Sequence, residues 1–351
     1  MKVYRARRPA ASLPCALTIG NFDGVHRGHQ AMLALLCGQA RQRGLPACVL
    51  TLEPNPRDFF ARLNGQPERA PARVGSLRDK LIELQRWGVA EVVVARFDQR
   101  MADMSPIDFI EGTLLRDLKT RYLLVGDDFR FGAHRAGDYK LLDSYGSARG
   151  LDVARMPSYE VHGLRVSSSA VRQALAEGDI AQAAALLGRP YRISGHVLHG
   201  RKLGRQLGAS ANARDDGFRT LNLRVPHAKP AAMGIFVVQV HGLTSHPLPG
   251  VASLGVRPTV EDAGRVLLEV HCLEWPLAPE AGYGRVVGVD LLHKLHDELR
   301  YESLRALEAG IAQDVADARA WLQRRRLGPP SSSPSGACGL TVHSPDAPRR
   351  S

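Results

Sequence analysis

Two histidines stand three positions apart, His26 and His29, where an apolar run ending at Ile19 gives way to a helical pattern. Residues three apart lie on one face of a helix, so both imidazoles can point at one ligand. A helix N-terminus adds unpaired N–H groups and partial positive charge. Small residues that allow a close approach of backbone and ligand surround the pair: Gly20, Gly24 and Gly28. The pattern predicts a phosphate-binding turn suited to a triphosphate that loses pyrophosphate.

Histidines near a helix start also occur as ordinary polar caps, and that alternative applies to each histidine taken alone. The glycines and the Phe22-Asp23-Gly24 turn favour a binding site instead. A second candidate is the run 167–169 of three serines, followed by Arg172. Hydroxyls at a helix start can contact phosphate oxygens, and the arginine can reach from the next turn. A plain serine-rich N-cap is the competing interpretation.

The first half of the chain must position these groups, and between Leu13 and about Gly188 it alternates short β-branched runs with helical stretches. The pattern predicts strands at 16–19, 47–52, 91–95 and 122–125, and helices at 30–43, 77–87 and 106–118. Such alternation is typical of a Rossmann-like α/β domain with a parallel sheet. Ligands of these sheets bind beyond the carboxyl ends of the strands, which is where the histidine turn lies.

After Pro190 the pattern changes to strand-like pieces separated by glycine and proline. They are predicted at 191–198, 220–225, 234–241, 250–256, 267–273 and 286–294. Their number and spacing favour a small, closed or nearly closed, Greek-key-like β-barrel. An amphipathic helix is expected at 303–325, packed on the barrel. We expect domains at 13–188 and 189–326, and a disordered tail at 327–351 that is rich in proline, serine and glycine.

Composition bounds the protein class less sharply. A chain of 351 residues with 44% hydrophobic residues can bury two ordinary cores. The net charge of +12 points to anionic partners, which include nucleic acid, membrane surfaces and small phosphates, and selects none of them. Five cysteines without metal-like spacing favour a reducing compartment. Prolines interrupt the N-terminal stretch, and no apolar run is long enough to cross a bilayer, so we expect a cytoplasmic protein without a membrane partner.

Several motifs together resemble a known family, the bacterial FAD synthetases. The first half is similar to their FMN adenylyltransferase module through the histidine turn, Gly-Asp-Asp-Phe-Arg-Phe-Gly at 126–132 and Ser-Ser-Ser-Ala-Val-Arg at 167–172. The second half is similar to their riboflavin kinase module. The matching segments there are 195–197, 200–205, 220–223, 255–259 and 268–271. The resemblance extends from about residue 13 to residue 325.

For the first half, the resemblance implies that the phosphate of FMN attacks the α-phosphorus of ATP directly, with no covalent enzyme intermediate. His26 and His29 would be the catalytic residues. The residues implied to bind ATP or its phosphates are Gly20, Asn21, Phe22, Asp23, Gly28, Ser167, Ser168, Ser169 and Arg172. The residues implied to bind the flavin are Asn55, Asp127, Asp128 and Phe129. The family commonly has a histidine in the segment that holds Asn55, and an amide can donate a hydrogen bond but cannot carry a proton charge.

For the second half, the resemblance implies that Glu269 is the base that takes the proton of the riboflavin hydroxyl. Strand alternation could turn its carboxylate toward the barrel mouth, and an exposed strand glutamate is the competing interpretation. Thr220 and Asn222 share a strand face and would hold Mg²⁺ with the nucleotide phosphates. A phosphate-facing loop would contain Gly200, Lys202 and Gly204.

The chain departs from the kinase pattern at residues 209–217, which look like an insertion between the glycine loop and Phe218. An enzyme that only adenylylates, with an impaired kinase site, is therefore one alternative. Another keeps nucleotidyl transfer but uses a different phosphorylated acceptor. A nucleic-acid-binding module is more distant, because aromatic residues are only 6% of the chain and do not alternate with basic ones. The expected substrates are ATP, riboflavin and FMN, with Mg²⁺ as cofactor and no nucleic acid; the oligomeric state stays open.

Overall fold

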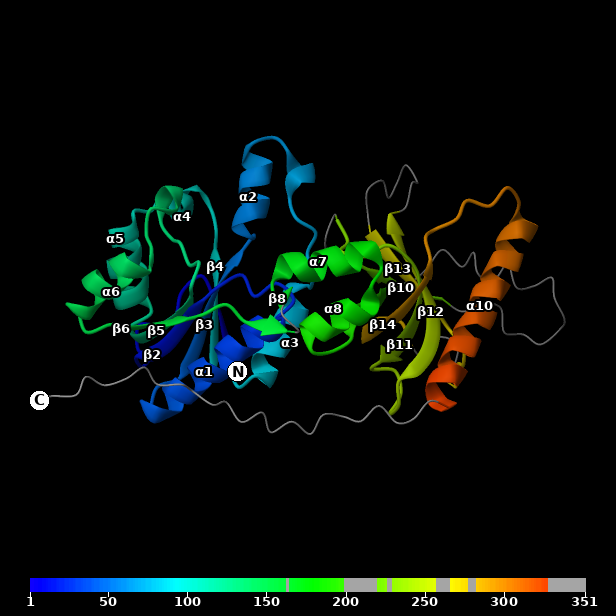
Figure 1. The fold of residues 1–351 in the computed structure, drawn as a ribbon, viewed down its shortest axis with the longest axis horizontal. Coiled ribbons are helices and arrows are strands. Elements are labelled where there is room, and N and C mark those ends of the chain that lie inside the picture. Colours follow the sequence, from blue (N-terminus) through cyan, green and yellow to red (C-terminus); the bar gives the residue numbers. More distant parts are fainter. Residues whose placement is uncertain (162–163, 199–219, 226–228, 257–265, 277–281, 328–351) are drawn as a thin grey trace, which may run out of the picture.

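The computed structural model describes residues 1–161, 164–198, 220–225, 229–256, 266–276 and 282–327. An α/β part and a β-barrel lie side by side along the longest axis, with two helices between them (Figure 1). Both predicted architectures are confirmed. The tail expected to be disordered lies almost entirely outside the described residues.

A six-stranded sheet in which all neighbouring strands are parallel forms the centre of the α/β part. Its strands are β1 (Lys2–Arg5), β2 (Cys15–Ile19), β3 (Ala47–Glu53), β4 (Glu91–Arg96), β5 (Thr120–Gly126) and β6 (Asp152–Met156). The order is β1-β4-β3-β2-β5-β6, so β2 lies where the chain order reverses. The carboxyl end of such a strand is the ligand position in open α/β sheets. The predicted histidine turn follows β2 directly.

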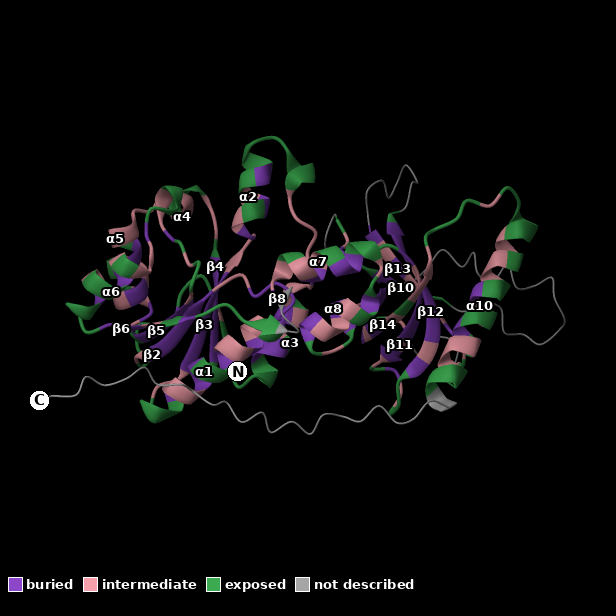
Figure 2. Ribbon diagram, viewed as in Figure 1, coloured by how far each residue is buried: buried purple, intermediate pink, exposed green. Residues whose placement is uncertain are grey.

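Helices cover both faces of this sheet, and β-branched runs such as that of β4 are therefore buried on both sides (Figure 2). One face carries α1 (Arg27–Gln42) and α3 (Leu77–Arg86). The other carries α5 (Pro106–Asp108), the π-helical segment η2 (Phe109–Asp117) and α6 (Tyr139–Ser147). The remaining short elements of this part are α2 (Pro56–Leu63), η1 (Pro67–Arg69), α4 (Gln99–Ala102), η3 (Ala133–Arg135), and the hairpin of β7 (Glu160–Val161) and β8 (Leu164–Arg165). The helix predicted at 106–118 is thus present as α5 and η2.

The barrel is closed by six antiparallel strands in the order β10-β13-β12-β11-β14-β9. Its strands are β9 (Tyr191–Leu198), β10 (Thr220–Arg224), β11 (Gly234–His241), β12 (Leu248–Val256), β13 (Val266–Cys272) and β14 (Val286–His296). Alternate residues of each strand fill the interior, as β13 shows with buried Leu268 and Val270 on either side of Glu269. The predicted C-terminal helix is α10 (Leu304–Leu327), which packs on the outside through Ala318.

Helices α7 (Ser168–Glu177) and α8 (Ile180–Leu187) join the two parts. Their buried side chains Val171, Leu175 and Leu186 belong to the same apolar cluster as the barrel interior. Val74 of the α/β part belongs to it as well. One continuous core therefore extends from the α/β part through α7 and α8 into the barrel. Among the described residues, no helix combines the length and the apolar character needed to span a membrane.

The edge strand β1 was not predicted, because the first domain was expected to begin near Leu13. Its sequence is basic and mostly exposed, without an apolar period that would mark a strand. The strand is fixed by parallel pairing with β4 and by Arg8, which follows it. The buried Arg8 guanidinium donates to Glu91 at 2.8 Å and to the carbonyl of Leu118 at 2.6 Å.

Arg8→Met should lower the free energy of unfolding by about 3–5 kcal/mol, because it leaves the Glu91 carboxylate buried without its partner. Arg7→Met is a matched control, since Arg7 is exposed, and should change stability by less than about 0.5 kcal/mol. Urea denaturation of both variants measures the difference. Equal stability of the two variants would contradict the assigned role of Arg8.

Candidate active sites

The turn between β2 and α1 has an unusual backbone. Phe22 and Val25 have positive φ values of 47° and 42°, and Gly24 lies between them at 82°. A positive φ is costly for a bulky or β-branched residue, so the surroundings must hold it in place. Both apolar side chains are buried, Phe22 at 1% exposure and Val25 at 0%. A Cβ on Gly24 would meet the Val74 side chain at 2.6 Å, so this position accepts only glycine.

His26 and His29 form a stacked pair at the start of α1. Their ring centroids lie 3.7 Å apart with planes inclined by 18°, and the Phe22 ring contacts His29 at a centroid distance of 4.8 Å. His26 is the N-cap, and its Nδ1 accepts from the backbone N–H of His29 at 3.4 Å. Because Nδ1 accepts, the proton of a neutral His26 ring belongs on Nε2. A Cβ at Gly28 would lie 3.3 Å from the His26 ring, so a small residue is required there.

Both imidazoles are neutral in the folded protein. Burial lowers the pKa of His26 to about 4. The positive charges of Arg172 and Arg189 also lower this pKa, whereas the nearby Asp23 carboxylate raises it. Burial also lowers the pKa of His29 well below its ordinary value, with His26 and Lys80 contributing. Nδ1 of His29 is buried without a hydrogen-bond partner among the described residues. The pair therefore offers neutral hydrogen-bond donors, whose protonation an approaching anion would favour.

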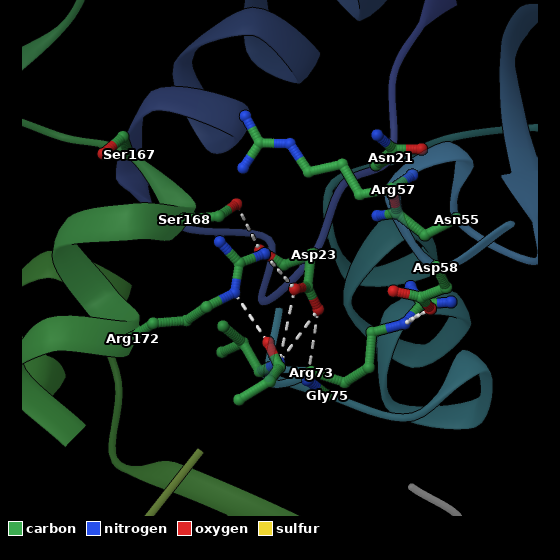
Figure 3. A network of polar contacts seen from close by, with 12 residues as sticks. Asn21, Asp23, Asn55, Arg57, Asp58, Arg73, Gly75, Ser167, Ser168 and Arg172 are labelled. Atoms are coloured by element: carbon green, nitrogen blue, oxygen red, sulfur yellow. Dashed lines mark hydrogen bonds and ion pairs between the residues drawn. The ribbon is translucent and has the colours of Figure 1, made fainter. Parts of the chain in front are cut away.

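Asp23 fixes the turn to two distant segments (Figure 3). Its carboxylate, 2% exposed, accepts from the backbone N–H groups of Val74 and Gly75 at 3.1 and 3.3 Å. The same carboxylate pairs with Arg172 of α7 at 2.7 Å, and Arg172 also donates to the Ala72 carbonyl at 2.6 Å. The sequence interpretation placed Asp23 and Arg172 on the ATP phosphates. In the structure they contact each other and the segment 72–75.

The three serines differ in what they contact. The Ser167 side chain caps α7 by accepting from Ala170 N–H at 3.1 Å, which is the plain N-cap interpretation. Ser168 donates to the backbone carbonyl of Asp23 at 2.9 Å and so joins α7 to the turn. Ser169 is exposed. Through Ser168 the structure brings the serine run beside the histidine turn.

Asn55 and α2 lie on the other side of the turn. Asn55 is 3% exposed, and its side-chain oxygen caps α2 by accepting from Arg57 N–H at 3.0 Å. The exposed Arg57 side chain extends from α2 toward the side on which Ser168 lies (Figure 3). Arg57 was not predicted from the sequence, because its position depends on how α2 is placed over the turn.

An aromatic group beside Asn55 was also missed. Phe59 and Phe60 of α2 and Phe97 after β4 contact one another edge to face, with centroid distances of 5.3 to 5.8 Å. Phe60 is 43% exposed, and the other two rings are partly exposed. The sequence around residues 59 and 60 does not indicate that Phe97, which follows β4, packs against them. The group forms an apolar, aromatic surface next to the polar turn.

The acidic pair after β5 lies at the same end of the sheet. Asp127 accepts from the backbone N–H and hydroxyl of Ser158, and these bonds are the main cause that lowers its pKa. Asp128 forms an ion pair with Arg165 at 3.0 Å. Phe129 stacks on Phe131 with a centroid distance of 5.7 Å. These contacts are those of a Gly-Asp turn, and within the described part of the chain they share no residue with the contacts of the histidine pair.

On the barrel, Asn222 of β10 lies directly opposite Glu269 of β13, and Thr220 lies opposite His271. Residues paired in this way have neighbouring side chains on one face of the sheet. The face is the outside of the barrel, because Leu221 and Leu268 fill the interior. The prediction that Thr220 and Asn222 share a face is confirmed. Strand alternation places Glu269 on this outer face as well, and its place relative to the barrel mouth stays a prediction.

The next strand adds a residue that the sequence analysis missed. Ser253 of β12 pairs with Glu269 on the other side, and its hydroxyl donates to Glu298 at 2.9 Å. A second carboxylate therefore lies one strand away from Glu269. The predicted phosphate loop with Gly200, Lys202 and Gly204, and the insertion 209–217, lie outside the described residues.

Comparisons with known proteins match both parts of the chain. A family model described as FAD synthetase matches residues 8–170, and one described as riboflavin kinase matches residues 187–322. The bifunctional riboflavin kinase/FMN adenylyltransferase of Escherichia coli K12 is 44% identical over 91% of this chain and 97% of its own length. The chain belongs to the family of bifunctional riboflavin kinase/FMN adenylyltransferases. The enzyme of that name from Pseudomonas fluorescens is also 44% identical, over 87% of this chain and 92% of its own.

A solved structure supports the fold. The crystal structure titled as a macrolide-efflux protein from Streptococcus pneumoniae superimposes with a TM-score of 0.73 and covers 92% of this chain and 100% of its own. At 24% identity this likeness concerns the fold alone. The two family models leave residues 171–186 between them unmatched, and this segment forms most of α7 and α8.

The stability of the enzyme should fall as the pH drops from about 6.5 to 4. The unfolded chain binds a proton at His26 below its ordinary pKa of 6.5, whereas the folded protein does so only near 4, so protons favour unfolding in this window. The contribution of His26 is on the order of 3 kcal/mol. His26→Asn keeps a capping side chain and should make the slope shallower. Urea denaturation across this pH range measures it.

His134→Asn, at an exposed histidine in the loop after β5, is the matched control and should keep the wild-type slope. An unchanged slope in His26→Asn would show that the folded protein does not hold this ring in its neutral form.

Proposed function

We propose that the chain phosphorylates riboflavin to FMN on the barrel and then transfers the AMP group of ATP to FMN at the carboxyl end of β2. In the second reaction, a phosphate oxygen of FMN bonds to the α-phosphorus of ATP. The bond from that phosphorus to the bridging oxygen breaks, and pyrophosphate leaves with the electron pair. The observation that carries this proposal is the stacked, neutral pair His26 and His29 at the start of α1, at the reversal point of a parallel sheet.

This site is suited to a transfer that needs no nucleophilic side chain. Positioned donors stabilise charge on phosphoryl oxygens, and they do so most effectively where water is excluded. The Nε2–H of His26, the ring of His29 and the first N–H groups of α1 supply such donors. We assign Ser169 and Arg57 as further phosphate contacts, because both are exposed beside the turn. Asp23, Arg172 and Ser168 then orient the turn from behind.

The flavin ring requires an apolar surface near the phosphate site. The aromatic group of Phe59, Phe60 and Phe97 provides one, and offset or edge-to-face contacts with a large ring are favourable. Asn55 lies at the base of α2, with its amide nitrogen as the donor that a flavin or phosphate would meet. Asp127, Asp128 and Phe129 remain candidates at the other side of the sheet end.

On the barrel, Glu269 is the proposed base for the riboflavin hydroxyl. Thr220 and Asn222 would hold Mg²⁺ together with the nucleotide phosphates, since hydroxyl and amide oxygens beside a carboxylate match the oxygen ligands that this ion prefers. Mg²⁺ would neutralise charge on the transferred phosphoryl group. The glycine loop at 200–204 would cover the phosphates.

We divide the chain between residues 188 and 189, at the glycine that ends α8, with β1 added to the first module. We place the enzyme in the cytoplasm, where its substrate ATP is made available, and assign it no nucleic-acid partner. An adenylyltransferase without kinase activity is the second candidate, and the insertion 209–217 beside the kinase motif is the observation that favours it.

Purified protein supplied with riboflavin, ATP and Mg²⁺ should form FMN first and FAD second. Chromatography of the flavins over time separates the three species. FAD formed from FMN but not from riboflavin would show that the kinase is inactive and would select the second candidate. No FAD from either flavin would refute the adenylyltransferase assignment.

Single substitutions should separate the two reactions. His29→Ala removes a donor at the β2 edge and should lower FAD formation from FMN about 10²–10³-fold while FMN formation stays within about twofold. Glu269→Gln should lower FMN formation about 10²–10⁴-fold and leave FAD formation from FMN intact. Each variant is the control for the other. Loss of both activities in one correctly folded variant would contradict separate sites.

A further inference from the structure

The histidine turn is held by groups from the start of the barrel part. Arg189 lies directly after the glycine that ends α8 and two residues before β9. Its guanidinium donates to the Gly24 carbonyl at 2.8 Å and to the Val25 carbonyl at 3.4 Å. These carbonyls belong to the two left-handed residues that precede His26. The two hydrogen bonds join residues that are separated by 165 and 164 positions in the chain.

A second donor completes the same arrangement. Gln30 of α1 donates to the Val25 carbonyl at 2.9 Å and to the Leu187 carbonyl at 2.7 Å, and Arg189 also reaches the Leu187 carbonyl at 3.3 Å. Gly188 has a φ of 70°, which directs the chain back toward α1, and a Cβ there would lie 3.1 Å from the Gln30 side chain. The end of α8 and the histidine turn are thereby joined through shared donors.

The backbone of Val25 explains why such donors are needed. A β-branched residue at positive φ is costly on its own and persists only where neighbouring contacts determine it. Burial of its side chain and two donors on its carbonyl supply those contacts. If the peptide rotated, His26 would lose its position as the cap of α1, and its ring would leave the stack with His29.

We propose that Arg189 is a positioning residue for adenylyl transfer: it holds the Gly24 and Val25 carbonyls so that His26 and the first turn of α1 face the nucleotide. This inference rests on the adenylyltransferase function proposed for the β2 edge. It means that the first module is completed by a residue that lies within the region matched by the riboflavin kinase model, which begins at residue 187. Arg189 itself does not touch the reacting atoms.

Arg189 also contacts Glu83, and this contact provides a control for its proposed role. Its Nε lies 3.4 Å from Glu83 of α3, and Arg86 pairs with the same carboxylate at 3.0 Å. Glu83 therefore keeps a partner when either arginine is replaced. Among the described contacts, Arg86 bonds Glu83 and no carbonyl of the turn. Replacing each arginine in turn therefore separates the loss of a Glu83 contact from the loss of the turn contacts.

The test uses the full-length protein with Arg189→Met, Arg189→Lys and the matched control Arg86→Met. Steady-state kinetics of FAD formation from FMN give kcat and KM for ATP, and FMN formation from riboflavin is measured in parallel. Arg189→Met should lower the adenylylation kcat about 10–100-fold, with a smaller change in KM, because displacement of a catalytic group by about 1 Å costs on this order. The rate of FMN formation by Arg189→Met, and both rates of Arg86→Met, should stay within twofold of wild type.

Arg189→Lys keeps a donor that can bond one carbonyl, so it should recover part of the lost kcat. A kcat for Arg189→Met within twofold of wild type would overturn the proposal. If Arg189→Met does not fold, Gln30→Met removes the other donor on the Val25 carbonyl and should lower kcat in the same way; an unchanged kcat there would overturn the proposal instead. Failure of the wild-type protein to adenylylate FMN at all would refute the proposed function, which is a different result.

Discussion

The geometry of the proposed adenylyl-transfer site depends on a short turn between β2 and α1 that contains residues with left-handed backbone. Side-chain donors bind the carbonyl groups of this turn. Phe22 and Val25 adopt conformations that an isolated chain would avoid. Side-chain donors from α1 and from the chain after α8 bond the carbonyls of Gly24 and Val25. The same turn leads into His26, which caps α1 and stacks on His29. We propose that phosphates bind where the first N–H groups of α1 and the imidazole pair come together.

The contacts that hold the turn also connect the two halves of the protein. Asp23 binds the segment 72–75 and α7, while Arg189 binds the turn from the barrel side. The bridge of Arg73 to Pro230 and a cavity of about 210 Å³ between α3 and the barrel lie along the same boundary. The proposed kinase residues Asn222 and Glu269 lie on the outer face of other barrel strands, β10 and β13. One continuous apolar core therefore connects the parts of the protein that carry the two proposed sites.

The fold was predictable because it depends on local periodicity. Alternating strand and helix patterns in the first half, and six strand-like pieces followed by an amphipathic helix in the second, determined both architectures. The histidine spacing and the shared face of Thr220 and Asn222 were predictable for the same reason. The outer face of Glu269 follows from the same period, because its neighbours Leu268 and Val270 are buried in the interior.

The parts that could not be predicted depend on contacts between distant residues. Arg172 meets Asp23 across 149 positions, and Arg8 meets Glu91 across 83. A charged residue looks the same in a sequence whether it is solvated, buried in an ion pair or bound to a ligand. The family resemblance assigned Asp23 and Arg172 to the ATP site, whereas in the structure they pair with each other and hold the turn. Phe97 joins the aromatic group of α2 only through the order of strands in the sheet.

The most direct measurement is a crystal structure of the full-length protein with a non-hydrolysable ATP analogue. The account predicts that the phosphates lie against His26 Nε2 and the first turn of α1, while the Asp23–Arg172 pair and the bonds from Arg189 to the turn stay intact. A structure in which Arg172 leaves Asp23 to bind the phosphates, or in which the nucleotide lies away from the two imidazoles, would contradict it.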